Sequence, residues 1–284
     1  MKNVLLAVSV ILPTSVLGEG FEEAWRLGGF SMPESAWYEA SIDKIIVSNI
    51  GVFGPDGGMD GRLSLVSRDG VLEDADWVTG LMDPKGISSH DGMLYVADAI
   101  GLQVVSIADG TLVSTIALDG ATFPNDVAVG ADGSVYVTDF LAGGLYRYHD
   151  VLAEVFMPAG SLPLPNGILV RDGTLWIGSF GDEMQADFSV AQPGGLWQVD
   201  IATKAVSPVE TAQGVGSVDG MIFVGEAVIF DDNPTGKMFI HDAAGTRELA
   251  SVGPGSADLG VIGDLVFVPN LGAGEIVAYQ YSAD

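Results

Sequence analysis

Short β-rich runs recur along the whole chain, and this repeat limits the possible folds more than any other feature. The six copies span residues 44–49, 93–98, 134–139, 174–179, 227–232 and 265–270, the last two being weaker. Three of them follow an Asp-Gly pair, at 91–92, 132–133 and 172–173. This dipeptide strongly indicates a two-residue β-hairpin turn. A glycine-containing loop and a further alternating strand follow several runs, so each unit is expected to hold three or four antiparallel strands.

Six units over residues 19–284 give about 44 residues each, the size of one four-stranded propeller blade. Helical periodicity is almost absent from the sequence. A β-sandwich or a pair of small barrels would not explain a repeat that runs from residue 34 to residue 282. We therefore predict an all-β, six-bladed β-propeller of four-stranded antiparallel blades. The segment 21–30 is expected to pair with the last unit and close the ring, which would remove free sheet edges.

The first eighteen residues have the pattern of a secretory signal peptide. Lys2 provides a positive start, residues 4–12 form a short apolar run, and residues 16–18 are small enough for cleavage. The apolar run is too short to span a bilayer. A buried N-terminal helix is the alternative, but Gly18 and Gly20 disfavour its continuation. We predict a signal peptide over residues 1–18, a single domain over 19–284, and a periplasmic or secreted protein.

Charge and cysteine content exclude several functional classes. The chain has 38 acidic and 11 basic residues, a formal net charge of −27, and no cysteine. Phosphate backbones and anionic lipids require clustered Lys and Arg, so nucleic-acid and membrane partners are not expected. Without cysteine, any metal must bind to oxygen or histidine ligands. A small-molecule substrate and a monomer are the expectations.

A short polar tripeptide precedes the first expected strand of each unit. In a propeller the innermost strands line one central channel, so equivalent residues form a ring at one of its mouths. The tripeptides lie at 33–35, 84–86, 124–126, 165–167, 218–220 and 257–259. Their central residues, 39 to 53 positions apart, are Glu34, Lys85, Asn125, Asn166, Asp219 and Asp258.

Glu34, Asn125, Asn166 and Asp219 give the ring two carboxylates and two amides, side-chain oxygens of the kind that calcium prefers, and Lys85 and Asp258 complete the ring. Each residue alone is better explained as a turn former. A turn does not, however, explain two carboxylates and two amides on one ring, where they would repel or lack partners without a cation. We predict a calcium site, with another divalent metal possible, at Glu34, Asn125, Asn166 and Asp219.

At these residues the chain resembles the six-bladed propellers of the senescence-marker-protein, gluconolactonase and luciferin-regenerating-enzyme group. Diisopropyl fluorophosphatase and the paraoxonases are more distant relatives. The resemblance covers nearly all of residues 19–284, and its motifs are specific only as a set. They are Glu34 before Trp37, residues 124–129 with 132–139, residues 165–167, and residues 217–220.

The resemblance implies one divalent ion in the channel, usually calcium, held by Glu34, Asn125, Asn166 and Asp219. It also implies hydrolysis of lactones, esters or phosphoesters. A hard cation with an open position polarises a carbonyl or phosphoryl oxygen. Asp219 is the candidate catalytic residue, either as the base that activates water or as a nucleophile; the sequence does not decide between these roles.

Two positions depart from the lactonase pattern. Regucalcin-like lactonases carry an arginine two residues before the third-blade Asn, where this chain has Phe123. The aromatic residue argues against sugar lactones and for a less polar substrate, or for one bound differently. Lys85 is a cation on a ring expected to hold another cation, so it is predicted to pair with Asp258 or Glu34 or to stabilise an oxyanion. The three histidines each adjoin an Asp in expected turns, and we place them away from the site.

Two long loops, 50–61 and 180–195, are expected at the same mouth as the ring. They belong to the first and fourth units, which face each other across a six-membered ring, and such loops commonly shape binding sites. Solvent-exposed flexible loops are the equally weighted alternative. The predicted substrate-binding residues are Lys85, Phe123, Asp258, Phe53, Met59, Met184 and Phe188.

Two functional classes remain after this reasoning. The first is a metal-dependent lactonase or esterase, which the oxygen ring favours. The second is a non-enzymatic propeller that binds a ligand or protein through the same face, which Phe123 and Lys85 keep open. A lyase or synthase on this scaffold is a weaker third. Propellers host all of these, so the fold alone does not separate them.

Overall fold

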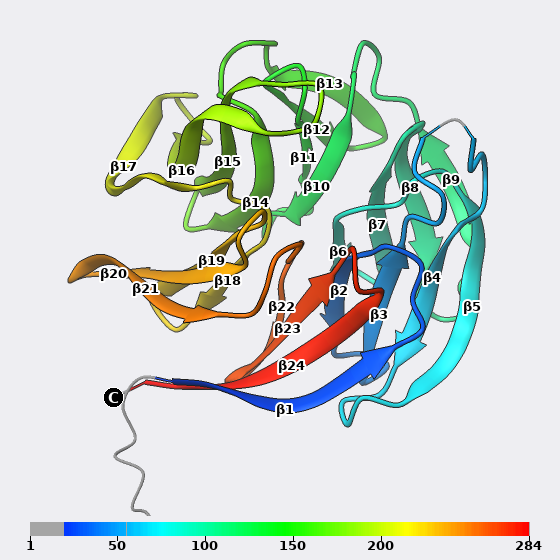
Figure 1. The fold of residues 1–284 in the computed structure, drawn as a ribbon. Helices are drawn as coiled ribbons and strands as arrows, with labels where there is room; N and C mark the ends of the chain where they lie inside the picture. Colours follow the sequence, from blue (N-terminus) through cyan, green and yellow to red (C-terminus); the bar gives the residue numbers. More distant parts are fainter. Residues whose placement is uncertain (1–19, 55, 284) are drawn as a thin grey trace, which may run out of the picture.

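The computed structural model describes residues 20–54 and 56–283, in which all regular secondary structure is β-strand. These strands form six four-stranded antiparallel sheets around a central channel (Figure 1). The predicted six-bladed propeller is therefore confirmed. The predicted signal peptide lies outside the described residues.

Every blade has the same order of strands, from the channel outward. The innermost strands are β2 (Pro33–Glu39), β6 (Ile87–His90), β10 (Pro124–Val129), β14 (Pro165–Arg171), β18 (Met221–Val224) and β22 (Gly260–Ile262). The second strands are β3 (Lys44–Asn49), β7 (Met93–Asp98), β11 (Val135–Asp139), β15 (Thr174–Met184), β19 (Ala227–Asp232) and β23 (Leu265–Asn270). The second strands thus coincide with the six recurring runs of the sequence.

The outer half of each blade is built from the remaining strands. The third strands are β4 (Gly61–Val66), β8 (Gly101–Ser106), β12 (Gly144–His149), β16 (Val190–Asp200), β20 (Lys237–Asp242) and β24 (Glu275–Ser282). The outermost strands are β5 (Leu72–Leu81), β9 (Leu112–Ile116), β13 (Leu152–Met157), β17 (Val206–Gly216), β21 (Gly245–Ser251) and β1 (Gly20–Gly28). These outermost strands are more exposed than the inner strands because each pairs with a neighbouring strand along one edge only.

The ring closes because the first strand completes the last blade. β1 pairs antiparallel with β24, from Gly20 opposite Ser282 to Gly28 opposite Glu275 (Figure 1). This confirms the predicted closure, although the strand begins and ends slightly earlier than the predicted segment 21–30. The pairing joins the two ends of the described chain in one sheet, so the last blade has no missing strand at its edge.

Two of the three Asp-Gly pairs form the predicted two-residue turns between first and second strands. The third, Asp132-Gly133, lies in a longer turn in which Gly130 N donates to the Ser134 carbonyl oxygen. Asp91 and Gly92, and likewise Asp172 and Gly173, all have positive φ angles of 49–77°. Two successive left-handed residues define a type I′ turn, which matches the twist of antiparallel strands. These turns lie at the channel mouth opposite the ring residues, because they end the strands that the ring residues begin.

Buried apolar side chains fill the spaces between neighbouring blades rather than one central core. One cluster, for example, joins blades three and four through Tyr136, Phe156, Ile168 and Leu175. The channel itself is consequently free to hold polar residues.

The expected loop 180–195 is largely ordered as strand. β15 and β16 continue as a paired hairpin to Met184 opposite Val190, which leaves only a short tip. The predicted loop 50–61 lacks regular strand structure at residues 50–54 and 56–60, and its last residue, Gly61, begins β4. Both segments connect second to third strands and so lie at the mouth of the channel that bears the ring residues.

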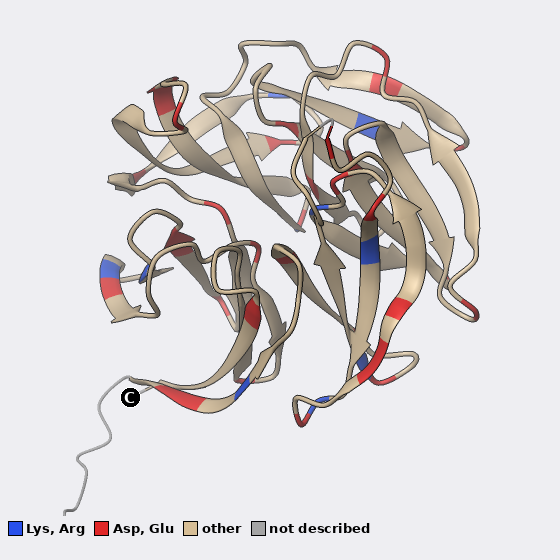
Figure 2. Ribbon diagram, turned by 45° about the vertical axis from the view of Figure 1, so that its right-hand side comes forward, with Lys and Arg blue, Asp and Glu red and all other residues tan. Residues whose placement is uncertain are grey.

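Acidic residues lie on most blades, and basic residues are few among them (Figure 2). No helix among the described residues is long and apolar enough to cross a membrane.

Candidate metal centre and substrate cavity

The four predicted metal ligands lie together at one mouth of the channel. Glu34, Asn125 and Asn166 stand at the start of β2, β10 and β14, and Asp219 stands two residues before β18. All four side chains are at least 94 % buried. They line one cavity of about 280 Å³. Residues from four blades thus converge on one space, as the repeat predicts.

Each of these four side chains has an oxygen without a hydrogen-bond partner. The unpaired buried atoms are Glu34 Oε2, Asn125 Oδ1, Asn166 Oδ1 and Asp219 Oδ1. Buried polar atoms are nearly always paired, because an unpaired one costs about 1–3 kcal/mol. Four such oxygens in one cavity therefore fit a divalent cation that binds oxygen ligands.

Asp219 is held in place by amide groups and by backbone contacts. Asn233 Nδ2 donates a hydrogen bond of 2.8 Å to Asp219 Oδ2, which leaves Oδ1 directed at the cavity. The buried Asp231 carboxylate accepts hydrogen bonds from the backbone N–H groups of Asp219 and Gly220, at 3.0 and 2.9 Å. These contacts fix both the side chain and the backbone that carries it.

Burial perturbs both carboxyl groups of the ring. It raises the pKa of Asp219 to about 7, although hydrogen bonds from Asn233 and Asn166 oppose the rise. Burial, and then the charge of Asp219, raise the pKa of Glu34 well above its usual range, while Lys85 opposes this effect. Without a cation, two ionised carboxylates at this depth are unfavourable.

Lys85 occupies the blade-two position of the ring but forms neither of the predicted ion pairs. Its Nζ donates to the Asp83 carbonyl oxygen at 2.8 Å and lies 4.7 Å from the centre of the Phe123 ring. Burial lowers the pKa of Lys85, and the charges of Glu34 and Asp83 oppose this. The ammonium thus adds positive charge beside Glu34 without direct contact to a carboxylate of the described residues.

Asp258 is not the sixth member of the ring, because the repeat is shifted by one residue in the last blade. Ala257 N donates to the Pro269 carbonyl oxygen, as Lys85 N does to the Ala97 carbonyl oxygen. Ala257 therefore occupies the ring position. The prediction that Asp258 belongs to the ring was wrong. The 257–259 segment lacks the proline or Asp-Gly pattern that marks the other tripeptides, so its equivalent position was misassigned by one residue.

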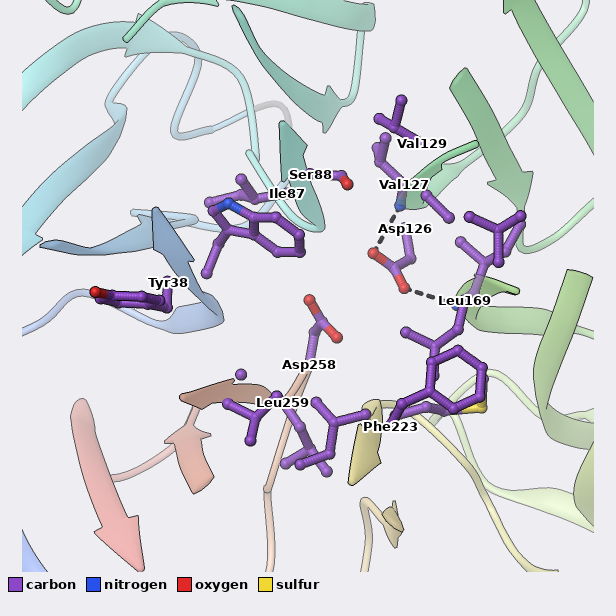
Figure 3. A pocket seen from close by; sticks show the side chains of 18 residues that line it. Tyr38, Ile87, Ser88, Asp126, Val127, Val129, Leu169, Phe223, Asp258 and Leu259 are labelled. Carbon is purple, nitrogen blue, oxygen red and sulfur yellow. Dashed lines mark hydrogen bonds between the residues drawn. The ribbon is translucent and has the colours of Figure 1, made fainter. Parts of the chain in front are cut away.

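Asp258 belongs instead to the next level of the channel. It lines a separate cavity of about 300 Å³ together with Asp126, from the opposite blade (Figure 3). Its Oδ2 accepts a hydrogen bond of 2.5 Å from Ser35 Oγ. Asp126 accepts hydrogen bonds from the backbone N–H groups of Val127 and Ile168, at 2.6 and 2.7 Å. Asp258 is thus absent from the residues that line the metal-side cavity.

Phenylalanine side chains form the wall above the oxygen ring. Phe53, Phe123 and Phe188 line the cavity as predicted, whereas Met59 and Met184 do not. The rings of Phe53 and Phe123 lie 6.2 Å apart, and those of Phe53 and Phe188 lie 6.3 Å apart, between ring centres. The two long segments of opposite blades therefore meet over the cavity through aromatic contact.

A second ring of cavity residues was missed in the sequence. The cavity-lining members are Ile50, Phe140, Phe180, Asn233 and Leu271. Four of the five follow the last residue of a second strand, whereas Phe180 lies within β15. In each, the backbone N–H donates to the carbonyl oxygen two residues before the ring position of the same blade. The same six-fold repeat that located the first ring could have located this one.

Histidine takes no part in the cavity. None of the three histidines is among its lining residues, as predicted. No group of three or more His, Asp or Glu suited to one metal occurs within residues 20–54 and 56–283. The candidate centre is compatible with this finding because two of its four ligands are amides.

Comparison with known proteins supports the resemblance inferred from the motifs. The family model for the N-terminal part of strictosidine synthase-like proteins matches residues 109–148. A crystal structure of a proposed gluconolactonase superposes with a TM-score of 0.66 over 93 % of each chain, at 17 % identity. The chain therefore shares the six-bladed propeller fold of this structure. Comparison with curated proteins gives no significant match.

Other solved structures are similar to this chain with comparable TM-scores. Virginiamycin B lyase from Staphylococcus aureus gives a TM-score of 0.63 at 11 % identity, over 90 % of this chain and 98 % of its own. A chain of a nidogen–laminin complex gives 0.62 at 13 % identity, over 78 % and 86 %. Since enzymes and a binding protein share the fold, function must be argued from the cavity itself.

Proposed function

We propose that this protein is a divalent-metal-dependent hydrolase, with calcium as the preferred ion, that acts on lactones or esters. The observation that carries the proposal is the set of four unpaired buried oxygens on Glu34, Asn125, Asn166 and Asp219. They stand at equivalent positions of four blades and share one cavity. The gluconolactonase-like fold supports the choice of reaction.

The four oxygens would hold the cation, and the rest of the cavity would hold the substrate. When bound, a hard divalent cation polarises the substrate carbonyl and stabilises negative charge on its oxygen. Asp219 offers a carboxylate oxygen to the cavity while Asn233 fixes the other oxygen. In hydrolysis, the oxygen of water joins the acyl carbon, the acyl C–O bond breaks, and the leaving alkoxide takes up a proton.

Asp219 would act as the base that takes the proton from water or as the nucleophile. Its hydrogen bond from Asn233 restricts rotation, so that Oδ1 keeps facing the cavity. Lys85 places a positive charge near the same floor, 4.7 Å from the Phe123 ring centre. It would favour the negative charge that develops on the substrate oxygen.

The proposal is tested by comparing wild type with Asn166→Ala and Asp219→Ala. Calcium binding is measured by titration calorimetry after chelator treatment, and hydrolysis is followed by acid release from simple lactones and esters. We expect both variants to lose most calcium affinity and hydrolysis, while circular dichroism remains that of a β-protein. Unchanged hydrolysis in both variants would refute the mechanism. Calcium-independent ligand binding without hydrolysis would favour a non-enzymatic binding propeller.

A further inference from the structure

The cavity over the oxygen ring has two chemically different halves. Its floor carries the oxygen ligands, Asn233 and Lys85, and eight of its fourteen lining residues are apolar. Four phenylalanines form a continuous chain of ring contacts: Phe53 with Phe123, Phe123 with Phe140, and Phe140 with Phe180, at 5.6–6.2 Å between ring centres. A ligand that reaches the floor must therefore place its other end against aromatic surface.

Phe188 completes this surface from the opposite side of the mouth. It lies at the tip of the β15–β16 hairpin, and its ring meets that of Phe53 edge to face, at 6.3 Å between ring centres. Both side chains are 42–45 % exposed. The loop that carries Phe53 is fixed by Asp83, whose carboxylate accepts a hydrogen bond from Gly54 N. The two phenylalanines thus form an apolar roof that contacts solvent on its outer side.

The backbone conformation at Phe188 indicates that the turn does not require an aromatic side chain at this position. Phe188 has a φ of 63°, in the left-handed region that glycine adopts without cost. A bulky residue there is strained by about 1–2 kcal/mol. The turn itself is closed by backbone bonds, Phe188 N to the Gln185 carbonyl oxygen and Gln185 N to the Ser189 carbonyl oxygen. Glycine would serve this turn better, so the phenylalanine is explained by its ring.

We infer that this site takes a small lactone or ester with an aromatic or other apolar substituent, which packs between Phe53, Phe123 and Phe188. This inference rests on the proposed hydrolase function. A hydroxyl-rich sugar lactone would bury hydroxyl groups against phenylalanine without hydrogen-bond partners, which is unfavourable. The volume of about 280 Å³ accommodates a small lactone ring with one apolar substituent such as a phenyl ring.

The kinetic test uses six-membered lactones that differ only in their substituents. We expect kcat/KM for phenyl-substituted δ-valerolactone to exceed that for glucono-1,5-lactone at least about tenfold. Phe188→Gly should remove most of this preference, because it should lower kcat/KM for the phenyl-substituted lactone more than for unsubstituted δ-valerolactone. The turn is retained in this variant because glycine suits its φ. Equal or better hydrolysis of the glucono-lactone by wild type would overturn the inference and leave the hydrolase proposal standing.

The matched control is Val151→Gly. Val151 also has a φ of 63°, in the β12–β13 turn, and is 90 % exposed. It is not among the residues lining the cavity. We expect this variant to keep the wild-type preference. Loss of the preference in Val151→Gly as well would show that the change at Phe188 acts through general turn stability, and would overturn the role of its ring.

A binding measurement separates failure of this inference from failure of the hydrolase proposal. Lactams resemble lactones but resist hydrolysis, so calorimetry with phenyl-substituted and polyhydroxylated six-membered lactams measures recognition alone. Tighter binding of the phenyl lactam, weakened by Phe188→Gly, supports the inference even if wild type hydrolyses no lactone. Equal affinity for both lactams, or no effect of Phe188→Gly, overturns it even if lactones are hydrolysed.

Discussion

Replacing Asp219 by asparagine should stabilise the metal-free protein at alkaline pH and weaken its response to calcium. The substituted amide keeps the shape of the side chain and an oxygen that accepts from Asn233, but it removes the charge. The pKa of Asp219 is about 7 in the folded protein, against 3.8 as the usual value. Since a tenfold change in an ionisation constant corresponds to about 1.4 kcal/mol, full ionisation costs the folded state about 4 kcal/mol.

The direction of this stability change follows from the pH at which Asp219 loses its proton in the unfolded and in the folded state. The unfolded chain ionises near pH 4 and the folded protein near pH 7. Stability from the protonated carboxyl is therefore fully present below about pH 4 and is lost as pH rises through about 7. In chelator at about pH 8.5, Asp219→Asn should be more stable than wild type by about 2–4 kcal/mol, and at about pH 4 by less than about 1 kcal/mol.

Calcium should act in the opposite direction. At about one hundred times its dissociation constant, a ligand specific to the folded state adds about 2.7 kcal/mol. Calcium should raise the free energy of unfolding of wild type by this amount and that of Asp219→Asn by much less. The stability advantage of the variant seen in chelator should therefore largely disappear in calcium. Urea unfolding followed by tryptophan fluorescence measures all conditions, with the exposed Asp182→Asn as control. A variant no more stable than wild type in chelator at the alkaline pH would refute the reasoning.

Three further changes test other contacts of the site. Asn233→Ala should lower kcat about 10- to 100-fold because Asp219 loses the hydrogen bond that orients it; an unchanged kcat would exclude that role. Lys85→Met should tighten calcium binding in calorimetry, because it removes the positive charge that acts on Glu34; weaker binding would contradict this. Gly167→Ala should cost about 1–3 kcal/mol in urea unfolding, since its Cβ would lie 2.5 Å from the Asp219 carbonyl oxygen; wild-type stability would show that the blades can separate.

The sequence alone determined the architecture because the pattern that defines each repeat unit lies within a short stretch of residues. Each unit carries its own strand alternation and turn residues, such as Asp91-Gly92, and six units of that size close into a ring. The same repeat predicted that Glu34, Asn125, Asn166 and Asp219 would lie at one mouth of the channel, and the structure brings them into one cavity. Equivalence between repeats carries spatial information that single motifs lack.

The tertiary structure decided what depends on register and on side-chain direction. A shift of one residue placed Asp258 at a different level of the channel and Ala257 in the ring. Strand side chains alternate in direction, so such a shift moves a residue away from its expected neighbours. The tripeptide at 257–259 gave no local sign of the shift, because only hydrogen bonds to other strands define it.

The partners of individual side chains also required the folded structure. Lys85 was expected to meet a carboxylate, yet it contacts a backbone carbonyl group and the Phe123 ring. Phe53 and Phe188 are far apart in the sequence and touch only because blades one and four face each other over the channel. The sequence therefore determined which residues recur at equivalent places, through local periodicity. Only the closed ring decided which of them meet, because contact between blades is a property of their packing.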